Sequence, residues 1–287
     1  MASRIRKSCA AAVKSIDIAR SRDAQAPEQS SDAVAVEEPL EIRVNGQAIS
    51  VTMRTPGNDD ELATGFLLSE DLLHKRDDLL EIIRPQRAEN DPRGSNWIDV
   101  RLSDGVNVDL AQLTRHVFAS SSCGLCGKAT IASIQQQHPP LSDKGVFTVR
   151  AEVLRTLPDL LRGEQTTFER TGGLHAAALF DKNGKLLVVR EDVGRHNAVD
   201  KVLGSQWLNR RWPPTRAILL VSGRTSFEIL QKSLVARLPI IAAVSAPSSL
   251  AVEFAERSGQ TLVGFLRGDG MNIYTHPQRI LWGEVDG

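Results

Sequence analysis

Hydrophobic and polar residues alternate along the first stretch of the chain that has a regular pattern. Ile42 and Val44 are separated by one polar residue, and the alternation resumes from Ile49 to Met53. Asn45-Gly46, which lies between these two runs, is a dipeptide typical of two-residue hairpin turns. The pattern therefore predicts a β-hairpin over residues 38–53.

A helical period follows this hairpin. Leu62, Phe66 and Leu73 recur at spacings that place them on one face of a helix. Asn58, with Glu61 three residues later, is typical of a helix N-terminus, because both side chains can satisfy backbone N–H groups there. We therefore expect a helix that begins just after Asn58.

A second hairpin is predicted where Asp104-Gly105 separates two short apolar runs. These runs are Trp97 to Leu102 and Val106 to Leu110. Together with the first hairpin and the helix, they indicate a small α+β domain over residues 36–117.

Strands and helices alternate in the second half of the predicted structure. Two strands, at 174–180 and 186–190, are joined by a turn at Asn183-Gly184. The elements predicted after them are a helix from Val199 towards Arg211, a strand at 217–221, a helix at 225–236, a strand at 240–244, a helix at 249–257 and a strand at 261–266. A Thr-x-x-Glu pair, Thr225 and Glu228, is expected to cap the second of these helices. The β-α-β-α-β order implies a three-layer α/β domain with a partly parallel sheet.

Four segments follow from these patterns. Residues 1–35 lack sustained periodicity and are expected to form a disordered arm. The small α+β domain occupies 36–117, a C-x-x-C loop with a linker helix occupies 118–145, and the α/β domain occupies 146–287.

Charge and hydropathy limit the classes of partner. The chain has 35 basic and 35 acidic residues, so no overall field favours nucleic acid or an anionic membrane. No apolar run reaches the length of a membrane span, and the basic N-terminus lacks the apolar stretch of an export signal. We therefore expect a cytoplasmic protein that binds neither nucleic acid nor membrane.

The most distinctive chemistry lies in a cysteine pair. Cys123 and Cys126 belong to the run Ser-Ser-Ser-Cys-Gly-Leu-Cys-Gly-Lys at 120–128, between the two predicted domains. In a reducing compartment such a pair can bind metal, form a redox-active disulfide or relay sulfur. A structural pair of buried thiols is a further possibility.

Zinc and thioredoxin-like chemistry each lack part of their usual pattern. Zinc sites need three or four ligands, and the pair supplies two, so no metal ligand set is predicted. Zinc deaminases combine H-x-E with P-C-x-x-C, but no glutamate lies two residues after His175 or His196, and Ser122 replaces the proline. A thioredoxin-like pair lies near the start of a βαβ unit, which here comes much later. The pair alone leaves these chemistries open.

Three polar segments follow predicted strands, where open α/β sheets place ligands. Residues 191–197 combine acidic, basic and imidazole side chains in one turn, and residues 222–226 contain Arg224 between small polar residues. Helix N-termini at such turns can bind anions. The alternative is that both are ordinary capped loops, with Asp192 capping a helix and paired with Arg195.

The third segment is the turn at 265–270, Phe-Leu-Arg-Gly-Asp-Gly. Its glycines allow close approach of a nucleotide, Asp269 can accept hydrogen bonds from a guanine edge, and Arg267 can contact phosphate. A plain turn is the alternative interpretation.

Taken together, these segments resemble the FdhD family, the sulfurtransferases accessory to formate dehydrogenase. The resemblance covers about residues 36–281. It is carried by the segments 58–66, 122–128, 171–176, 190–197, 222–226, 264–267 and 272–276.

The resemblance implies a sulfur carrier. Persulfide sulfur would come from a cysteine desulfurase and pass to a molybdenum bis(molybdopterin guanine dinucleotide) cofactor, bound as a substrate, before its insertion into formate dehydrogenase. By this resemblance Cys123 carries the persulfide, Cys126 is its companion, and the cofactor contacts are Phe265, Leu266, Arg267, Gly268, Asp269 and Gly270. The resemblance further implies a homodimer, and an α/β domain similar to the cytidine deaminase fold without its zinc.

Our hypothesis from the sequence is a sulfurtransferase, with Arg195, His196 and Arg224 supporting the cofactor phosphates. A zinc-dependent deaminase and a non-catalytic cofactor chaperone are the alternatives.

Overall fold

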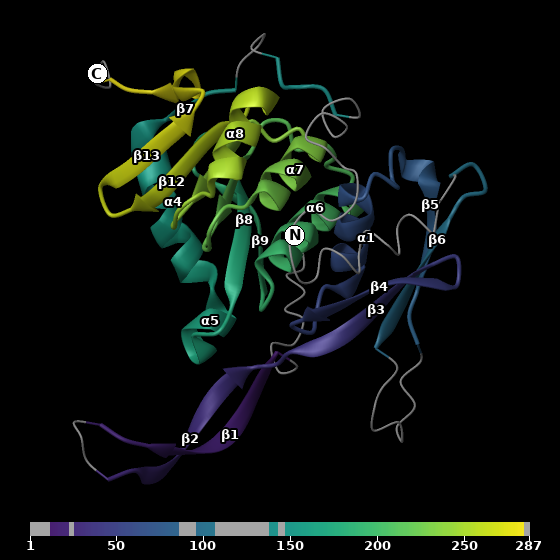
Figure 1. Ribbon diagram of the computed structural model, residues 1–287, viewed down its shortest axis with the longest axis vertical. Coiled ribbons are helices and arrows are strands. Elements are labelled where there is room, and N and C mark those ends of the chain that lie inside the picture. Colours follow the sequence, from purple (N-terminus) through teal and green to yellow (C-terminus); the bar gives the residue numbers. More distant parts are fainter. Residues whose placement is uncertain (1–11, 23–25, 86–95, 107–137, 143–146, 284–287) are drawn as a thin grey trace, which may run out of the picture.

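The computed structural model describes residues 12–22, 26–85, 96–106, 138–142 and 147–283. In these residues a small sheet with one helix packs against a larger sheet covered by helices, and a two-stranded hairpin extends from the body (Figure 1). The mixed α/β fold class predicted from the sequence is confirmed. No helix in these residues is long and apolar enough to cross a membrane.

The hairpin occupies a segment for which the sequence predicts disorder. Strands β1 (Val13–Arg20) and β2 (Glu28–Ala35) pair antiparallel along their full length. Most of their side chains are exposed, and Ile16 retains 38% of its accessible surface. Because the ribbon buries no continuous apolar face, its sequence carries no clear alternation, and backbone hydrogen bonds hold the pairing.

The small domain contains a four-stranded sheet in the order β4-β3-β6-β5. Its elements are β3 (Glu38–Val44), β4 (Gln47–Arg54), α1 (Asp59–Ser69), the 3₁₀ turn η2 (Arg76–Asp78), β5 (Leu79–Ile83) and β6 (Trp97–Leu102). Asn45 and Gly46 have positive φ angles of 50° and 85°, as the predicted hairpin turn requires. The predicted helix is confirmed, although the Asn58 side chain makes no capping hydrogen bond and the helix ends at Ser69, before Leu73.

Strand β6 has partners that the sequence did not predict. It pairs antiparallel with β5 and parallel with β3. Residues 107–110, which the sequence assigns to its hairpin partner, lie outside the described residues. Parallel pairing brings together segments far apart in the chain, so local turn signals cannot reveal it.

The α/β domain is built on a six-stranded sheet in the order β13-β12-β11-β10-β8-β9. Its strands are β8 (His175–Phe180), β9 (Leu186–Asp192), β10 (Ile218–Val221), β11 (Ile240–Ala243), β12 (Thr261–Arg267) and β13 (Gly270–Thr275). Strands β10, β11 and β12 run parallel, and the remaining neighbours pair antiparallel. The five strands predicted in this domain are therefore confirmed and the sheet is partly parallel, whereas β13 was not predicted.

Helices cover both faces of this sheet (Figure 1). One core contains side chains of α6 (Arg195–Leu208), α7 (Phe227–Val235) and α8 (Ser249–Ser258), and the other contains those of α4 (Ala151–Glu164). Alternate residues of β8 point into the two cores, with Ala177 and Leu179 on one side and Ala176, Ala178 and Phe180 on the other. This period of two makes the domain three layers thick.

Shorter elements complete the described part of this domain. They are α5 (Thr166–Thr171), the 3₁₀ turn η3 (Pro277–Arg279) and the two-residue strands β7 (Val149–Arg150) and β14 (Ile280–Leu281), which pair with each other.

Helices α1 and α6 join the two domains at very close range. A Cβ atom added to Gly65 would lie 1.9 Å from the carbonyl oxygen of Asp200, and one added to Gly204 would lie 1.9 Å from that of Glu61. The two backbones therefore touch directly, which only glycine permits. This contact fixes the small domain against the helix that opens the candidate site.

Two polar contacts cross the same interface. Ser69 on α1 donates to a carboxylate oxygen of Asp200 at 2.9 Å, and Lys232 on α7 holds that carboxylate by donating to both of its oxygens at 2.8 and 2.9 Å. Glu61 on α1 forms an ion pair with Arg190 on β9. The predicted domain boundaries at 35, 117 and 145 stay predictions, and those at 117 and 145 lie outside the described residues.

Candidate functional site

The three polar segments singled out in the sequence meet at one edge of the six-stranded sheet. Parallel strands β10, β11 and β12 all end there, and the first residue of β8 and the last of β9 lie beside them. Ser222 N donates to Ala176 O at 2.9 Å, and Phe265 N donates to Ser245 O at 3.1 Å. A bridge between Thr225 and Pro247 connects the two loops that lie between these points.

The N-terminus of α6 is shaped by a buried carboxylate. Asp192 is fully buried, and its Oδ1 accepts from Gly194 N at 2.8 Å and from Asn197 Nδ2 at 2.9 Å. Its Oδ2 accepts from Thr55 N at 3.2 Å and pairs with Lys201 Nζ at 2.6 Å. Asp192 therefore holds the turn before the helix, but it does not cap the helix as the alternative interpretation predicted: the N-cap is Gly194, no side chain caps it, and the charged partner of Asp192 is Lys201 and not Arg195.

The end of β4 is part of the same network. Thr55 contributes all of its polar groups, since Lys201 also donates to its carbonyl oxygen at 2.9 Å and its hydroxyl accepts from Val193 N at 3.2 Å. Asn197 donates to Met53 O at 2.8 Å. The small domain thus holds the turn that precedes Arg195.

Cationic side chains gather in front of this turn. Burial lowers the pKa of His175, and the nearby charges of Arg195, His196 and Arg224 lower it further. A Cβ atom on Gly223 would lie 3.1 Å from His175 Nδ1, so the loop after β10 lies directly against the imidazole. These contacts bring the three predicted phosphate-supporting residues to one place, together with His175, for which the sequence made no specific prediction.

Helix dipoles add to this positive field. The first N–H groups of α6 and α7 have no partner within their helices and carry partial positive charge. The two helix starts meet where His196 Nε2 lies 3.0 Å from Ser226 Oγ. Oriented N–H groups and cationic side chains in one place are the chemistry that binds phosphate.

Two buried polar atoms in this region have no hydrogen-bond partner among the described residues. They are Nε of Arg195 and the hydroxyl of Thr225, a residue that is only 1% exposed. Buried polar atoms are rarely left unpaired. Their position beside the cationic groups is consistent with a ligand that accepts hydrogen bonds.

A serine, a histidine and a glutamate lie together here without forming a catalytic triad. Ser226 Oγ and Glu228 Oε2 both approach the same nitrogen of His196, at 3.0 and 2.9 Å. A relay needs the nucleophile and the carboxylate on opposite ring nitrogens. The hydrogen bond from His196 lowers the pKa of Glu228, so this carboxylate stays ionised and holds the imidazole in place.

The capping box predicted at the start of α7 is therefore wrong. The helix begins at Phe227, its N-cap is Ser226, and no side chain caps it. Thr225 lies in the preceding loop, and Glu228 is engaged with His196. The spacing in the sequence predicted a cap, but in the folded protein the Glu228 carboxylate forms a charge-assisted hydrogen bond with His196.

The predicted cofactor turn at 265–270 carries a strained residue. Phe265 has a φ angle of +51°, which is unusual for a bulky aromatic residue. The strand bulges between Gly264 and Arg267, and the Arg267 guanidinium lies 5.7 Å from the Phe265 ring centroid. Backbone strain of this kind is often found at binding sites.

The six residues of this turn have different surroundings. Phe265 is half-buried, Arg267, Gly268, Asp269 and Gly270 are exposed, and the Leu266 side chain is fully buried in the core. Leu266 therefore offers a ligand only its backbone.

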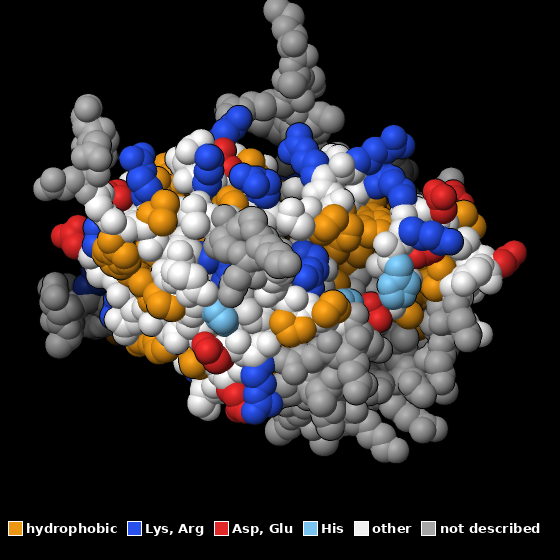
Figure 2. Space-filling view, turned by 90° about the horizontal axis from the view of Figure 1, so that it is seen from above, with side chains coloured by type: hydrophobic (Ala, Val, Ile, Leu, Met, Phe, Trp, Pro, Cys, Tyr) orange, Lys and Arg blue, Asp and Glu red, His pale blue; other side chains and the backbone are white. Residues whose placement is uncertain are grey.

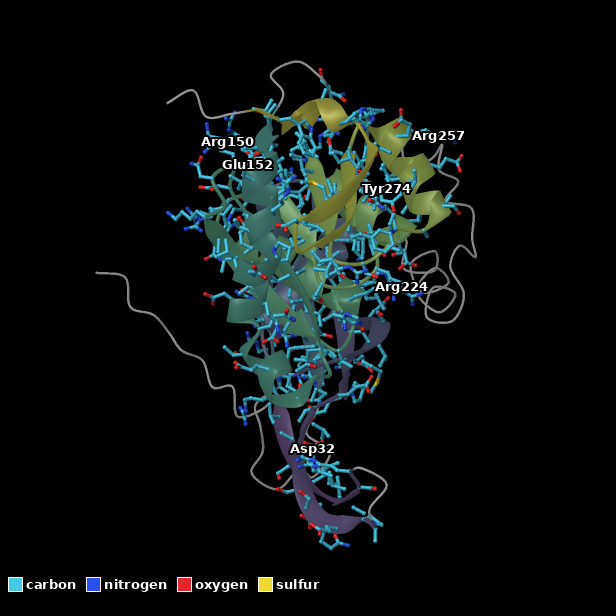
Figure 3. The ribbon with its side chains drawn as sticks, turned by 90° about the vertical axis from the view of Figure 1, so that its left-hand side faces the viewer. Asp32, Arg150, Glu152, Arg224, Arg257 and Tyr274 are labelled. Carbon is cyan, nitrogen blue, oxygen red and sulfur yellow. The ribbon has the colours of Figure 1, made fainter. Side chains whose placement is uncertain are left out.

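Tyr274 is a neighbour of this turn for which the sequence predicted no contact. A Cβ atom on Gly264 would lie 2.9 Å from both its ring and Pro247. Figure 3 shows Tyr274 and Arg224 on the same side of the α/β domain.

Cys123 and Cys126 lie outside the described residues, so their predicted roles stay predictions. Among the residues that the structure describes, no group of three or more His, Cys, Asp or Glu side chains is arranged to hold a metal ion.

Comparisons with known proteins identify one family. The sequence model of the FdhD/NarQ family matches residues 35–281. A sulfur carrier protein FdhD from Mycobacterium tuberculosis is 52% identical over 253 residues, which cover 87% of this chain and 92% of that protein. One from Sulfolobus acidocaldarius is 47% identical over 251 residues, with 88% and 92% covered.

A solved structure gives the same result. The crystal structure described as that of a formate dehydrogenase accessory protein from Desulfotalea psychrophila matches with a TM-score of 0.74 and 27% identity. The match covers 94% of this chain and all of that one.

Proposed function

Because the chain belongs to the FdhD/NarQ family, we propose that it is a sulfur carrier that receives persulfide sulfur from a cysteine desulfurase and delivers it to a molybdenum cofactor. The substrate is the bis(molybdopterin guanine dinucleotide) form of the cofactor, and the final recipient is formate dehydrogenase. The carrier acts in the cytoplasm as a homodimer.

One observation supports this proposal most strongly. His175, Arg195, His196 and Arg224 converge on the starts of two helices at one edge of the sheet. This arrangement suits the diphosphate of a guanine dinucleotide, because guanidinium groups and helix N-termini both recognise phosphate oxygens.

The turn at 265–270 would hold the guanine base. The Asp269 carboxylate can accept two hydrogen bonds from the Watson–Crick edge of guanine, and the exposed Arg267 can contact phosphate. The Phe265 ring, held at the strained bulge, offers an aromatic face for stacking. Glycines 268 and 270 leave room for the ligand to approach the backbone.

Sulfur would be acquired by thiol exchange. The Cys123 thiolate attacks the outer sulfur of the desulfurase persulfide, so that one S–S bond forms on Cys123 while the S–S bond of the desulfurase breaks and its thiolate leaves. The carrier then holds a Cys123 persulfide, and no net oxidation has occurred.

Release would use the second cysteine. The Cys126 thiolate attacks the inner sulfur of the Cys123 persulfide and forms a Cys123–Cys126 disulfide. The terminal sulfur leaves as hydrosulfide and becomes a ligand of the metal in the bound substrate. A cellular thiol reductant then restores the dithiol, which completes the electron balance.

Intact-mass measurement after incubation with a cysteine desulfurase and cysteine tests the sulfur step. We expect the wild type to gain the mass of one sulfur atom, Cys123→Ala to gain none, and Cys126→Ala to gain the sulfur without delivering it. Sulfur on Cys123→Ala would contradict the assignment. Formate dehydrogenase activity supported by a double cysteine variant would instead favour the chaperone alternative.

Binding of guanosine diphosphate tests the nucleotide site separately. We expect Arg224→Ala to weaken binding about tenfold, since a charge-assisted hydrogen bond contributes roughly 1.5–3 kcal/mol. Arg257→Ala is the matched control, because Arg257 is an exposed arginine paired with Glu253 on α8. Equal affinities in the two variants would contradict the placement of the phosphates.

A further inference from the structure

Glu228 places a negative charge inside the candidate nucleotide site. It is the second residue of α7, and its Oε2 lies 2.9 Å from Nε2 of His196, the second residue of α6. The carboxylate thus connects the starts of the two helices. These are the helix starts at which the phosphate groups of the substrate would bind.

The first turn of α6 gives a physical reason for an anion at this position. The helix begins with Arg195 and His196 and has no acidic residue in its first turn. A helix N-terminus carries partial positive charge, so basic side chains are unfavourable there. The Glu228 carboxylate offsets this charge. The hydrogen bond from His196 and the charges of Lys232 and Arg195 hold its pKa below the ordinary value, so it stays ionised.

The imidazole nitrogen that contacts Glu228 cannot serve the carboxylate and a ligand together. Nε2 of a histidine carries at most one hydrogen. In the structure this nitrogen already faces Ser226 Oγ at 3.0 Å as well as the Glu228 carboxylate. Two anions in contact with one imidazole would also repel each other. A phosphate oxygen that accepts a hydrogen bond from His196 must therefore displace Glu228.

This contact can break without separating the two helices. The His196 and Glu228 side chains keep 31% and 35% of their accessible surface, and ion pairs at this exposure contribute little stability. A second link between α6 and α7 is buried: the side chains of Asp200 and Lys232 keep 4% and 12% and lie 2.8 Å apart. The buried link would hold the helices together when a ligand replaces the exposed one.

We propose that Glu228 is an internal competitor of the substrate phosphate, which occupies His196 in the unliganded protein and is displaced when a nucleoside diphosphate binds. The inference rests on the proposed nucleotide site and adds a residue that limits the affinity of that site. Inorganic phosphate can gain contacts only with the cationic groups, and it must displace the carboxylate to reach His196. A guanine nucleotide gains further contacts at the turn 265–270, which compensate for this displacement. Glu228 therefore keeps simple phosphates weakly bound.

Removal of the Glu228 charge should strengthen nucleotide binding, whereas removal of a ligand contact would weaken it. We expect Glu228→Gln to bind guanosine diphosphate about fivefold more tightly than the wild type, which is the most that an exposed ion pair usually contributes. Calorimetry on the full chain measures this change. In a His196→Ala background the same substitution should have a smaller effect, because the competition acts through His196.

Glu253→Gln is the matched control. Glu253 is exposed and forms an ion pair with Arg257 on α8, and Figure 3 shows Arg257 apart from Arg224. Acidic and basic side chains also lie among one another on the end of the molecule seen in Figure 2, so such pairs are common on the surface. Both substitutions change the net charge equally. We expect Glu253→Gln to leave the affinity unchanged, and an equal gain there would overturn the proposal.

Two further results would contradict the competition. One is an unchanged or weaker affinity in Glu228→Gln, since the carboxylate would then have no effect on the nucleotide or would contact it directly. The other is a gain of the same size with and without His196. If neither the wild type nor Glu228→Gln binds guanosine diphosphate, the nucleotide site is contradicted as well. Sulfur loading on Cys123 is measured independently, so failure of the competition alone leaves the proposed carrier function standing.

Discussion

At the scale of single residues, buried charge is the feature that most constrains this protein. Asp192 and Lys201 are 0% and 1% exposed at their side chains and lie 2.6 Å apart, with Thr55 bonded to both. The pair lies directly behind the turn that presents Arg195. Its two charges cancel, so that the front of the turn keeps its positive field for an anion.

Removal of one charge of the buried Asp192–Lys201 pair should destabilise the fold. We expect Lys201→Met to lower the free energy of unfolding by about 3–5 kcal/mol, because a buried carboxylate would lose its counter-charge. Chemical denaturation measures this change. The double variant Asp192→Asn/Lys201→Met should recover much of the stability, since both charges are then absent. A double variant as unstable as the single one would show that packing, not charge, is responsible.

His175 gives a prediction about pH. Its folded pKa lies below that of the unfolded chain, which is about 6.5. As the pH falls through 6.5, the unfolded chain takes up the proton first, so the free energy of unfolding should decrease. Above this pH range His175 is neutral in both the folded and the unfolded chain, so it does not change the free energy of unfolding. His175→Asn should lack this part of the decrease, whereas the control His74→Asn, on the exposed surface of the small domain, should retain it.

At the scale of elements, the contact between α1 and α6 decides where the small domain lies. Gly65 and Gly204 allow the two helix backbones to meet, and the Glu61–Arg190 ion pair lies at the same interface. Two of the segments that carry the family resemblance, 58–66 and 190–197, therefore meet here. Part of these two segments therefore serves the packing of the domains and not ligand binding.

Substitution of these glycines should lower the stability of the protein. We expect Gly65→Ala to lower the free energy of unfolding by more than about 2 kcal/mol, because the added methyl group would overlap the backbone of Asp200. Gly163→Ala in α4 is the matched control: its Cβ would meet no atom within 4 Å, so it should be neutral or stabilise the helix slightly. Thermal unfolding of both variants checks this, and similar midpoints would contradict the close contact.

At the scale of the whole molecule, the six-stranded sheet separates two sets of cationic groups. One set surrounds the candidate nucleotide site at the C-terminal ends of the parallel strands, and the other, Arg216, Arg237 and Arg279, lies at their N-terminal ends. Because the total charge is zero, these sets are local fields and not a general attraction for polyanions. The β1–β2 hairpin extends away from the body of the molecule and contributes no residue to the three hydrophobic cores (Figure 1).

The sequence by itself determined the features that depend on local pattern. The Asn45-Gly46 turn and the alternating strands and helices from β8 onwards followed from periodicity and turn chemistry, which act over a few residues. The same reasoning placed the polar segments at the ends of strands, where parallel topology brings them together. It missed the β1–β2 hairpin, because that ribbon has no buried face to impose an apolar pattern.

Only the tertiary structure decided which charged groups became partners. Glu61 and Glu228 both stood at capping positions in the sequence, yet one pairs with Arg190 and the other with His196. Asp192 forms an ion pair with Lys201, and not with Arg195, and accepts a hydrogen bond from the distant Thr55. Such pairings join residues on different elements, some of them more than a hundred residues apart in the chain. The energy of a charge pair depends on distance and burial, which no local pattern contains.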